Sequence, residues 1–146
     1  MVFFFVAATR SVTLSALGAW VIKCNPHKTP IEPMRAAGEV ESSWCVADNY
    51  RSRLIRPEHR VLFWVSAHPQ RGLWGAGRVI GNVAGGDGQL RMPVHIRLFT
   101  QPVTAAQLFS LPELRSMEAF RSPQQSNPSW VSRAELALID PLLPST

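Results

Sequence analysis

The chain has 146 residues, of which 46% are hydrophobic and 17% are charged. This length suits one domain with a single core, and the composition excludes an intrinsically disordered chain. Fifteen basic residues against ten acidic ones leave a net charge of +5, which favours an anionic partner such as nucleic acid. The basic residues are scattered and form no basic tail, so charge alone does not define a binding site.

The two cysteines, Cys24 and Cys45, do not form a C-x-x-C pair, and no histidine cluster completes a zinc site with them. We therefore expect neither a metal nor a cofactor. Free thiols are typical of a reducing compartment, so the expected location is the cytoplasm. No stretch reaches the roughly 18 apolar residues that a membrane-spanning helix requires, and we expect no membrane association.

The first 18 residues differ in character from the rest of the chain. The apolar run from Val2 to Ala8 has no basic residue before it, and Arg10 follows it, which argues against a secretory signal. The run is either an additional strand or an extension of uncertain order. We therefore predict an N-terminal extension over residues 1–18 and a single domain over residues 19–146.

The first elements of the domain follow from apolar runs and turn residues. A buried strand is expected at 19–24, and a short helix at 30–37 with Thr29 as its N-cap. A loop then carries Trp44. Residues 49–55 are too short a segment to assign.

Two further strands are expected at 60–66 and 73–80, because both are rich in β-branched and aromatic residues. Gly75 and Gly77 indicate a close backbone approach or a bulge in the second of these strands. A glycine-rich turn is expected at 82–88.

The last strand is expected at 90–99, where Pro93 indicates an edge or a bulge. Two capping boxes mark helix starts further along the chain. The elements expected there are a helix from the box Thr104–Gln107, a helical turn at 111–117, a polar loop at 120–130 and a terminal helix from the box Ser132–Glu135. Four or five mostly sequential strands with helices between and after them predict an α+β fold with a strongly bent sheet or barrel.

Short motifs follow one another in a fixed order over residues 19–139. They are Trp20-Val21-Ile22-Lys23-Cys24-Asn25-Pro26, Trp44-x-Val46, Tyr50-Arg51, Arg60-Val61-Leu62-Phe63-Trp64, Gly72-x-Trp74-Gly75-x-Gly77, Pro102-Val103 and Pro123-Gln124-x-x-Asn127. In this order and spacing the sequence resembles the EVE domain, a PUA-like domain related to YTH domains, in the subtype found as standalone proteins and fused to McrB-type restriction proteins. The resemblance implies a PUA-like pseudo-β-barrel of about five or six bent strands with short helices packed around it.

The same resemblance implies a pocket for a flipped, often modified, nucleobase. In the family the first strand ends at the pocket rim, which corresponds here to Lys23, Cys24 and Asn25. The tryptophan after the first helix is a cage wall in YTH domains, which corresponds to Trp44, and Cys45 stands where YTH domains carry a serine. Related domains prefer modified cytosines and YTH domains prefer N6-methyladenine. Cys24 replaces a serine of the YTH domains and Asn25 a glutamate of many EVE proteins, so the base preference does not transfer directly.

A flipped base costs a few kcal/mol to unstack, and stacking on one aromatic ring returns about 1–3 kcal/mol. A second wall and hydrogen bonds to the base edge must supply the rest. Asparagine and glutamine side chains suit that edge because they both donate and accept. The predicted base-binding pocket consists of Lys23, Cys24, Asn25, Trp44, Cys45, Tyr50, Trp64, Ser66, Trp74, Gln124 and Asn127.

Each of these residues also has a purely structural alternative. Trp64 lies in so apolar a strand that core packing is favoured for it, whereas Trp74 is balanced between core and pocket. Asn25 and Asn127 precede prolines, where asparagine is common in turns. Arginines can contact the nucleic-acid backbone, although each is also compatible with an ordinary solvated surface. The candidates for backbone contacts are Arg51, Arg53, Arg56, Arg71 and Arg78.

The sequence gives little support to catalysis, since it has no serine elbow, H-E-x-x-H, P-loop or dinucleotide fingerprint. A thiol enzyme using Cys24 or Cys45 is the least favoured hypothesis. We predict a non-catalytic reader of a modified base, with cytosine ahead of N6-methyladenine and DNA ahead of RNA. A nuclease or an AAA+ restriction protein is a compatible partner. The alternative is a protein-interaction or small-metabolite-binding domain on the same fold.

Overall fold

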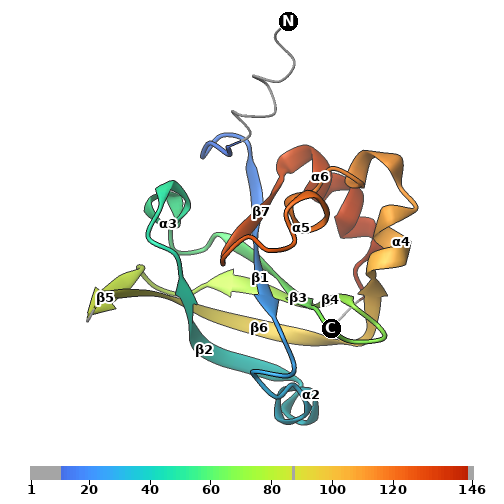
Figure 1. Cartoon of the computed structure of the whole chain (residues 1–146), viewed down its shortest axis with the longest axis horizontal. Coiled ribbons are helices and arrows are strands. Elements are labelled where there is room, and N and C mark those ends of the chain that lie inside the picture. Colours follow the sequence, from blue (N-terminus) through green and yellow to red (C-terminus); the bar gives the residue numbers. More distant parts are fainter. Residues whose placement is uncertain (1–10, 87, 145–146) are drawn as a thin grey trace, which may run out of the picture.

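The computed structural model describes residues 11–86 and 88–144. A single seven-stranded sheet dominates it, and short helices flank the sheet (Figure 1). The strands are β1 (Leu17–Cys24), β2 (Glu39–Val46), β3 (Arg60–Val65), β4 (Gly72–Val79), β5 (Ala84–Gly86), β6 (Gln89–Thr104) and β7 (Ser129–Ser132). The helices are α2 (Glu32–Ala37), α3 (Tyr50–Leu54), α4 (Ala105–Phe109), α5 (Glu118–Arg121), α6 (Arg133–Ile139) and two 3-10 turns, Pro112–Leu114 and Asp140–Leu142. Among these described residues, no helix is long and apolar enough to cross a membrane.

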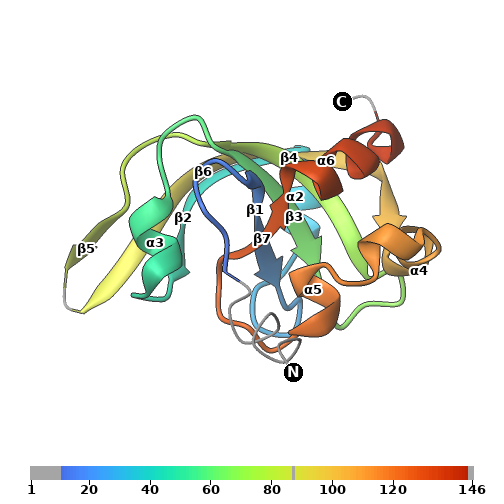
Figure 2. The same cartoon turned by 90° about the horizontal axis from the view of Figure 1, so that it is seen from above.

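The sheet is mixed and does not close into a barrel. Its strand order is β2-β6-β4-β3-β1-β7, and β5 pairs with the first part of β6. Strands β1 and β3 run parallel, and the other pairs are antiparallel. The long β6 curves across the molecule, so that β2 at one end of the order passes near β1 and β7 at the other (Figures 1 and 2). The expected α+β class and strongly bent sheet are therefore confirmed, with seven strands rather than four to six.

Three strands lie where the sequence predicts loops or turns. They are β2, in place of the loop carrying Trp44, β5, in the glycine-rich turn, and β7, at the end of the polar loop. Strand β2 is mostly exposed, and polar residues occupy much of it, so it lacks an apolar signal of its own. Its pairing with β6 over eight positions stabilises it instead.

Pro93, expected at an edge or a bulge, stands at a local edge within a central strand. Strand β6 is central, with β2 on one side and β4 on the other. Pro93 is opposite Ser43 of β2, at the point where the β4 ladder ends with Val79 opposite Val94. A missing backbone N–H is tolerated where one of the two ladders stops.

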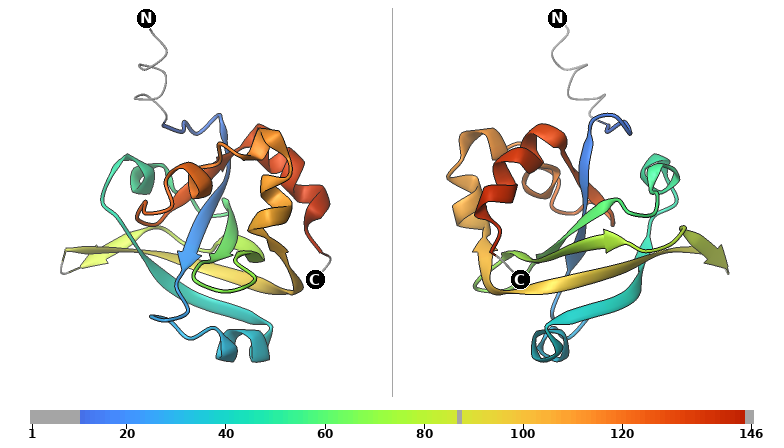
Figure 3. Two further views of the ribbon diagram at one scale, coloured as in Figure 1. Left: turned by 45° about the vertical axis from the view of Figure 1, so that its right-hand side comes forward. Right: turned by 180° about the vertical axis from the view of Figure 1, so that it is seen from behind.

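Strands β1 and β3 are buried on both faces, which explains their continuous apolar runs. Alternate side chains feed two separate cores. Trp20 and Phe63 belong to the core that α2 and α3 border, whereas Val21 and Leu62 belong to the core beneath α4 and α6 (Figure 3). The sheet is therefore a wall between two hydrophobic clusters, and the helices divide between its faces.

The predictions made from local chemistry hold at several points. Thr104 and Ser132 cap α4 and α6 through complete capping boxes. A Cβ atom added to Gly77 would lie 1.7 Å from the backbone oxygen of His95, so this glycine allows the close approach of β4 to β6. The register between these strands also shifts between Leu73 and Gly75.

The start of the domain lies before residue 19. Strand β1 begins at Leu17, and Val12 is 4% exposed and belongs to a core cluster. Part of the expected extension therefore packs onto the domain. The apolar run from Val2 to Ala8 lies outside the described residues.

Candidate functional site

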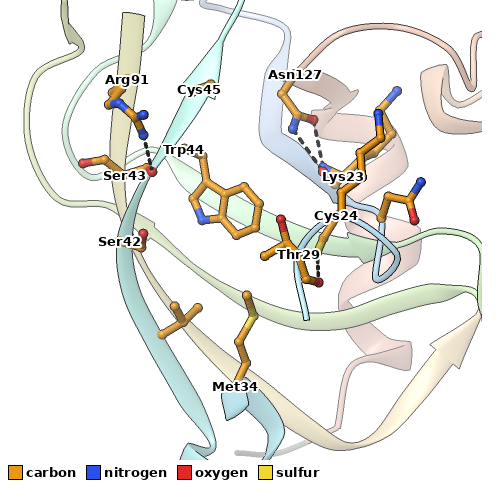
Figure 4. Close-up of a pocket in the computed structure, with 13 residues that line it drawn as sticks. Lys23, Cys24, Thr29, Met34, Ser42, Ser43, Trp44, Cys45, Arg91 and Asn127 are labelled. Atoms are coloured by element: carbon orange, nitrogen blue, oxygen red, sulfur yellow. Dashed lines mark hydrogen bonds between the residues drawn. The ribbon is translucent and has the colours of Figure 1, made fainter. Parts of the chain in front are cut away.

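A cavity of ≈520 Å³ lies between β2 and the C-terminal end of β1, where the sheet stays open (Figure 4). Its walls come from three separate parts of the chain. The lining residues are Lys23, Cys24, Asn25, Lys28 and Thr29 from the end of β1 and the following turn, Met34 from α2, Val40, Ser42, Ser43, Trp44 and Cys45 from β2, Arg91 from β6, and Asn127 before β7. We call this the seam cavity.

Trp44 is the only aromatic residue among the described residues that line the seam cavity. It projects from β2, and its indole extends toward the side where Cys24 and Thr29 lie (Figure 4). The indole ring of Trp44 packs against the ring of Phe63, with 5.7 Å between the two centroids and 57° between the two ring planes. Met34 and Val40 pack nearby on the same core cluster. One supported aromatic wall with apolar neighbours suits a flat ligand.

The opposite wall is held in place by Asn127. Its Oδ1 accepts a hydrogen bond from the Lys23 backbone N–H at 2.8 Å, and its Nδ2 donates to the Lys23 carbonyl at 3.0 Å. The carboxamide thus pairs with β1 as a strand would. This geometry supports the structural alternative for Asn127, because both of its polar atoms are already engaged with the backbone.

Asn25 also serves the turn that follows β1. Its Oδ1 accepts a hydrogen bond from His27 N–H at 2.9 Å, while its carbonyl accepts from the backbone of Lys28 and Thr29. The turn alternative for Asn25 is therefore present in the structure. The side chain still lines the cavity, and its Nδ2 has no partner among the described residues.

The two cysteines border the same cavity in different environments. Cys24 is 2% exposed and donates from Sγ to the Thr29 carbonyl at 3.7 Å. Burial raises the pKa of the Cys24 thiol to about 11, so the thiol is protonated at neutral pH. Cys45 is exposed, and its Sγ contacts Oε1 of Gln89 at 3.3 Å.

The seam cavity is electropositive. Lys23, Lys28 and Arg91 line it, and none of the described lining residues is acidic. Burial lowers the pKa of Lys23, an effect that the Glu118 carboxylate opposes and the Arg51 guanidinium reinforces. The Lys23 ammonium donates to the Pro123 carbonyl at 3.2 Å. A half-buried cation without a carboxylate against it favours an oxygen acceptor from a ligand.

The other three aromatic residues predicted for the pocket lie outside the seam cavity. Trp64 is 3% exposed and packs edge-on against Phe120, as its core alternative anticipated. Trp74 is equally buried, and its Nε1 donates to the Gln70 carbonyl at 2.9 Å. Tyr50 accepts a hydrogen bond from Val12 N–H at 3.2 Å. None of these three lines the seam cavity, so the described part of the chain gives it one aromatic wall rather than a cage.

Ser66 and Gln124 line a neighbouring cavity of ≈320 Å³ instead of the seam cavity. The Ser66 hydroxyl donates to the Cys24 carbonyl at 3.2 Å, which ties the end of β3 to the end of β1. Trp64 and Arg71 also border this second cavity. The structure therefore divides the predicted pocket between two adjoining hollows.

The predicted backbone-contacting arginines have different surroundings. Arg51 is 8% exposed and forms a buried ion pair with Glu118, so its prediction as a phosphate contact does not fit the fold. Arg53 is exposed near Asp48, Arg56 donates to the carbonyls of Arg53 and Ile55, and Arg78 donates to the Glu58 carbonyl. Of this group only Arg71 lies beside a cavity described above.

Seven lining residues of the seam cavity were not predicted. They are Lys28, Thr29, Met34, Val40, Ser42, Ser43 and Arg91. Ser42 stands two positions before Trp44, so a strand at β2 places both side chains on one face, whereas Ser43 belongs to the other face. Arg91 is opposite Cys45 in the β2–β6 ladder and donates to the Ser43 carbonyl at 3.3 Å. Its position follows from strand register, which depends on pairing between distant segments.

Solved structures of low sequence identity share this architecture. PSPTO5229 from Pseudomonas syringae matches with a TM-score of 0.67 at 15% identity, over 85% of this chain and 98% of that one. A hypothetical protein from Leishmania major matches with a TM-score of 0.66 at 22% identity, over 89% and 96%. Human THYN1, solved in complex with DNA containing 5-methylcytosine, matches with a TM-score of 0.64 at 16% identity, over 88% and 98%. No protein-family model and no curated protein matches the chain.

These matches cover almost the whole of each neighbour. The chain has the PUA-like fold. At these identities the likeness concerns the fold, so the chemistry of this PUA-like domain has to be argued from its own side chains. Those side chains form an electropositive cavity with one tryptophan wall at the open seam of the sheet.

Proposed function

We propose that this PUA-like domain binds nucleic acid and accommodates a flipped, modified nucleobase in the seam cavity, with Trp44 as the stacking surface. The observation that carries the proposal is the position of Trp44, partly exposed in a cavity lined by three cations and no described acidic residue. A neighbour of the same fold, human THYN1, was solved with DNA that contains 5-methylcytosine. The net charge of +5 suits the same anionic partner.

The lining favours a base edge rich in hydrogen-bond acceptors. Lys23, Lys28 and Arg91 are donors only, and cytosine presents O2 and N3 as adjacent acceptors on its Watson–Crick edge. The hydroxyl of Ser42, on the same face of β2 as Trp44, can accept from an exocyclic amino group. Met34 and Val40 provide apolar contact for an added methyl group. We therefore place a modified cytosine first and N6-methyladenine second, with DNA ahead of RNA.

We further propose that the domain has no catalytic step of its own. A thiol nucleophile must ionise, and the raised pKa of Cys24 opposes this at neutral pH. Cys45 is exposed, but its sulfur contacts the Gln89 amide rather than a histidine that could act as a base.

The test is fluorescence anisotropy of labelled single-stranded oligonucleotides that differ at one central position. The panel contains cytosine, 5-methylcytosine, 5-hydroxymethylcytosine, adenine and N6-methyladenine. We expect tighter binding of one modified base than of its unmodified parent. Trp44→Ala should weaken that complex by roughly 5- to 150-fold, because stacking on one ring is worth about 1–3 kcal/mol. Trp44→Phe should retain most of the affinity.

Phe109→Ala is the matched control, because Phe109 is an exposed aromatic residue that does not line the seam cavity. Equal, salt-sensitive binding of all five oligonucleotides would contradict the proposal and leave only non-specific charge attraction. The absence of any binding would favour the protein-interaction or small-metabolite alternative.

A further inference from the structure

The second cavity, of ≈320 Å³, shares a wall with the seam cavity. Lys23, Asn25, Lys28 and Asn127 line both, so the end of β1 and its turn form a ridge between them. One ligand can therefore occupy both cavities at once if it extends across the ridge. We call the second hollow the ridge cavity.

The ridge cavity is polar and cationic. Lys23, Lys28 and Arg71 supply positive charge, amide and hydroxyl side chains such as Gln124 and Ser126 surround them, and none of its described lining residues is acidic. Trp64, the one aromatic residue among its described lining residues, is 3% exposed and presents no open face for stacking. This chemistry suits a compact oxyanion better than a second base.

Lys28 and Arg71 differ from most described cations of this protein because their charged groups have no protein partner at all among the described residues. Across residues 11–86 and 88–144, neither side chain forms an ion pair or a side-chain hydrogen bond. Other arginines contact carboxylates, as in the pairs Arg51–Glu118 and Arg60–Asp140, or backbone carbonyls, as Arg78 does with Glu58. The carboxylate that acts on Lys23, Glu118, is buried and bound by Arg51.

The backbone at Arg71 is held rigidly. Its N–H donates to the His68 carbonyl at 3.0 Å, and its carbonyl accepts from Ala105 N–H at 2.7 Å. The turn before it is fixed by Trp74, whose Nε1 donates to the Gln70 carbonyl and whose ring meets the His68 ring edge-on at 4.7 Å. A cation on a fixed backbone loses less entropy when it binds an anion.

We propose that the ridge cavity is a phosphate subsite, in which Lys28 and Arg71 bind a backbone phosphate adjacent to the nucleotide whose base enters the seam cavity. Lys23, which lines both hollows, lies between the base and this phosphate. The inference rests on the proposed function, since the seam cavity defines which phosphate is meant. It assigns separate roles to the two hollows: the seam cavity selects the base, and the ridge cavity positions the strand.

The experiment measures the dissociation constants of the modified and unmodified oligonucleotides over a series of NaCl concentrations. For Arg71→Gln and Lys28→Gln we expect weaker binding and a log–log salt slope reduced by about 0.7 for each lost contact to single-stranded DNA. The ratio of modified to unmodified affinity should stay at the wild-type value, because phosphate contacts carry no base information. Arg97→Gln, at an exposed arginine outside both cavities, should leave slope and affinity unchanged.

The outcomes separate this inference from the proposed function. If Arg71→Gln and Lys28→Gln keep both the preference for the modified base and the wild-type salt slope, the phosphate subsite is overturned and the proposed function stands. Loss of the preference in those two variants also overturns it, because the residues would then act on the base. A reduced slope in a protein that never prefers a modified base overturns the base-reader proposal and with it the placement of the phosphate beside a flipped nucleotide, and leaves only phosphate binding in the ridge cavity.

Discussion

The carboxamide of Asn127 pairs with the backbone of Lys23, accepting from its N–H at 2.8 Å and donating to its carbonyl at 3.0 Å. The two residues are 104 positions apart in the sequence. This pairing fixes the wall that the seam and ridge cavities share, and it joins the segment before β7 to the end of β1.

Replacing Asn127 should therefore affect both stability and binding. We expect Asn127→Ala to lower the free energy of unfolding by about 2 kcal/mol, because each lost hydrogen bond contributes about 1 kcal/mol net. Oligonucleotide binding should weaken as well, since Lys23 is no longer held. Urea denaturation followed by anisotropy titration measures both effects. Asn82→Ala, at an exposed asparagine, is the control, and equal stability of the two variants would contradict the structural role.

The buried ion pair between Arg51 and Glu118 links α3 to α5. Removing one partner breaks the pair and leaves a buried charge with at most the longer contact between Arg121 and Glu118 at 4.0 Å, so we expect Arg51→Met or Glu118→Leu to cost about 3–5 kcal/mol each. The double variant should lose clearly less than the sum of the two. A double-mutant cycle from urea denaturation measures this coupling. Arg53→Met, which removes an exposed pair with Asp48, should change stability by only about 0–1 kcal/mol.

His59 predicts a loss of stability at acidic pH. Its Nδ1 accepts from Trp20 Nε1 at 3.0 Å and from Arg56 N–H at 3.1 Å, so that nitrogen carries no proton in the folded state. Burial, reinforced by the Arg56 charge, lowers the pKa of His59 below 6.5. The unfolded chain therefore binds a proton first as the pH falls. The stability contribution is complete above 6.5 and is lost as the pH falls toward the folded pKa.

Urea denaturation of the wild type and of His59→Gln across this pH range checks the effect. Glutamine can accept a hydrogen bond but does not titrate, so the variant should have a flatter dependence of stability on pH below 6.5. Identical pH profiles for the two proteins would show that His59 does not contribute.

The two thiols should react at very different rates. At pH 7 we expect an alkylating reagent to modify Cys45, which is exposed, and to leave Cys24 largely unmodified because burial raises its pKa to about 11. Intact-mass spectrometry follows the reaction, and Cys45→Ser should abolish the fast phase. Rapid labelling of Cys24 in the folded Cys45→Ser variant would contradict the assigned environment and reopen the thiol-enzyme hypothesis.

Local sequence predicts the elements that carry a distinct residue pattern of their own. The apolar runs of β1 and β3 identify them as strands because both of their faces are buried, and the two capping boxes identify the starts of α4 and α6 because capping is a matter of neighbouring residues. Strand β2 could not be predicted from its own residues, because it is mostly exposed and is stabilised by its pairing with β6.

The same distinction applies to the site. Trp44, Lys23 and Asn127 could be selected from motif order and residue chemistry, and all three line the seam cavity. The apolar run around Trp64 favoured the core for it, but the roles of Trp74 and Arg51 could not be selected, because neither residue carries a local mark of whether it will be buried. Tertiary packing buried Trp74 and Arg51, and it brought Arg91, Met34 and Lys28 to the cavity through strand register and the open seam between β2 and β1. Burial and register depend on contacts between segments far apart in the chain, so only the folded sheet determined them.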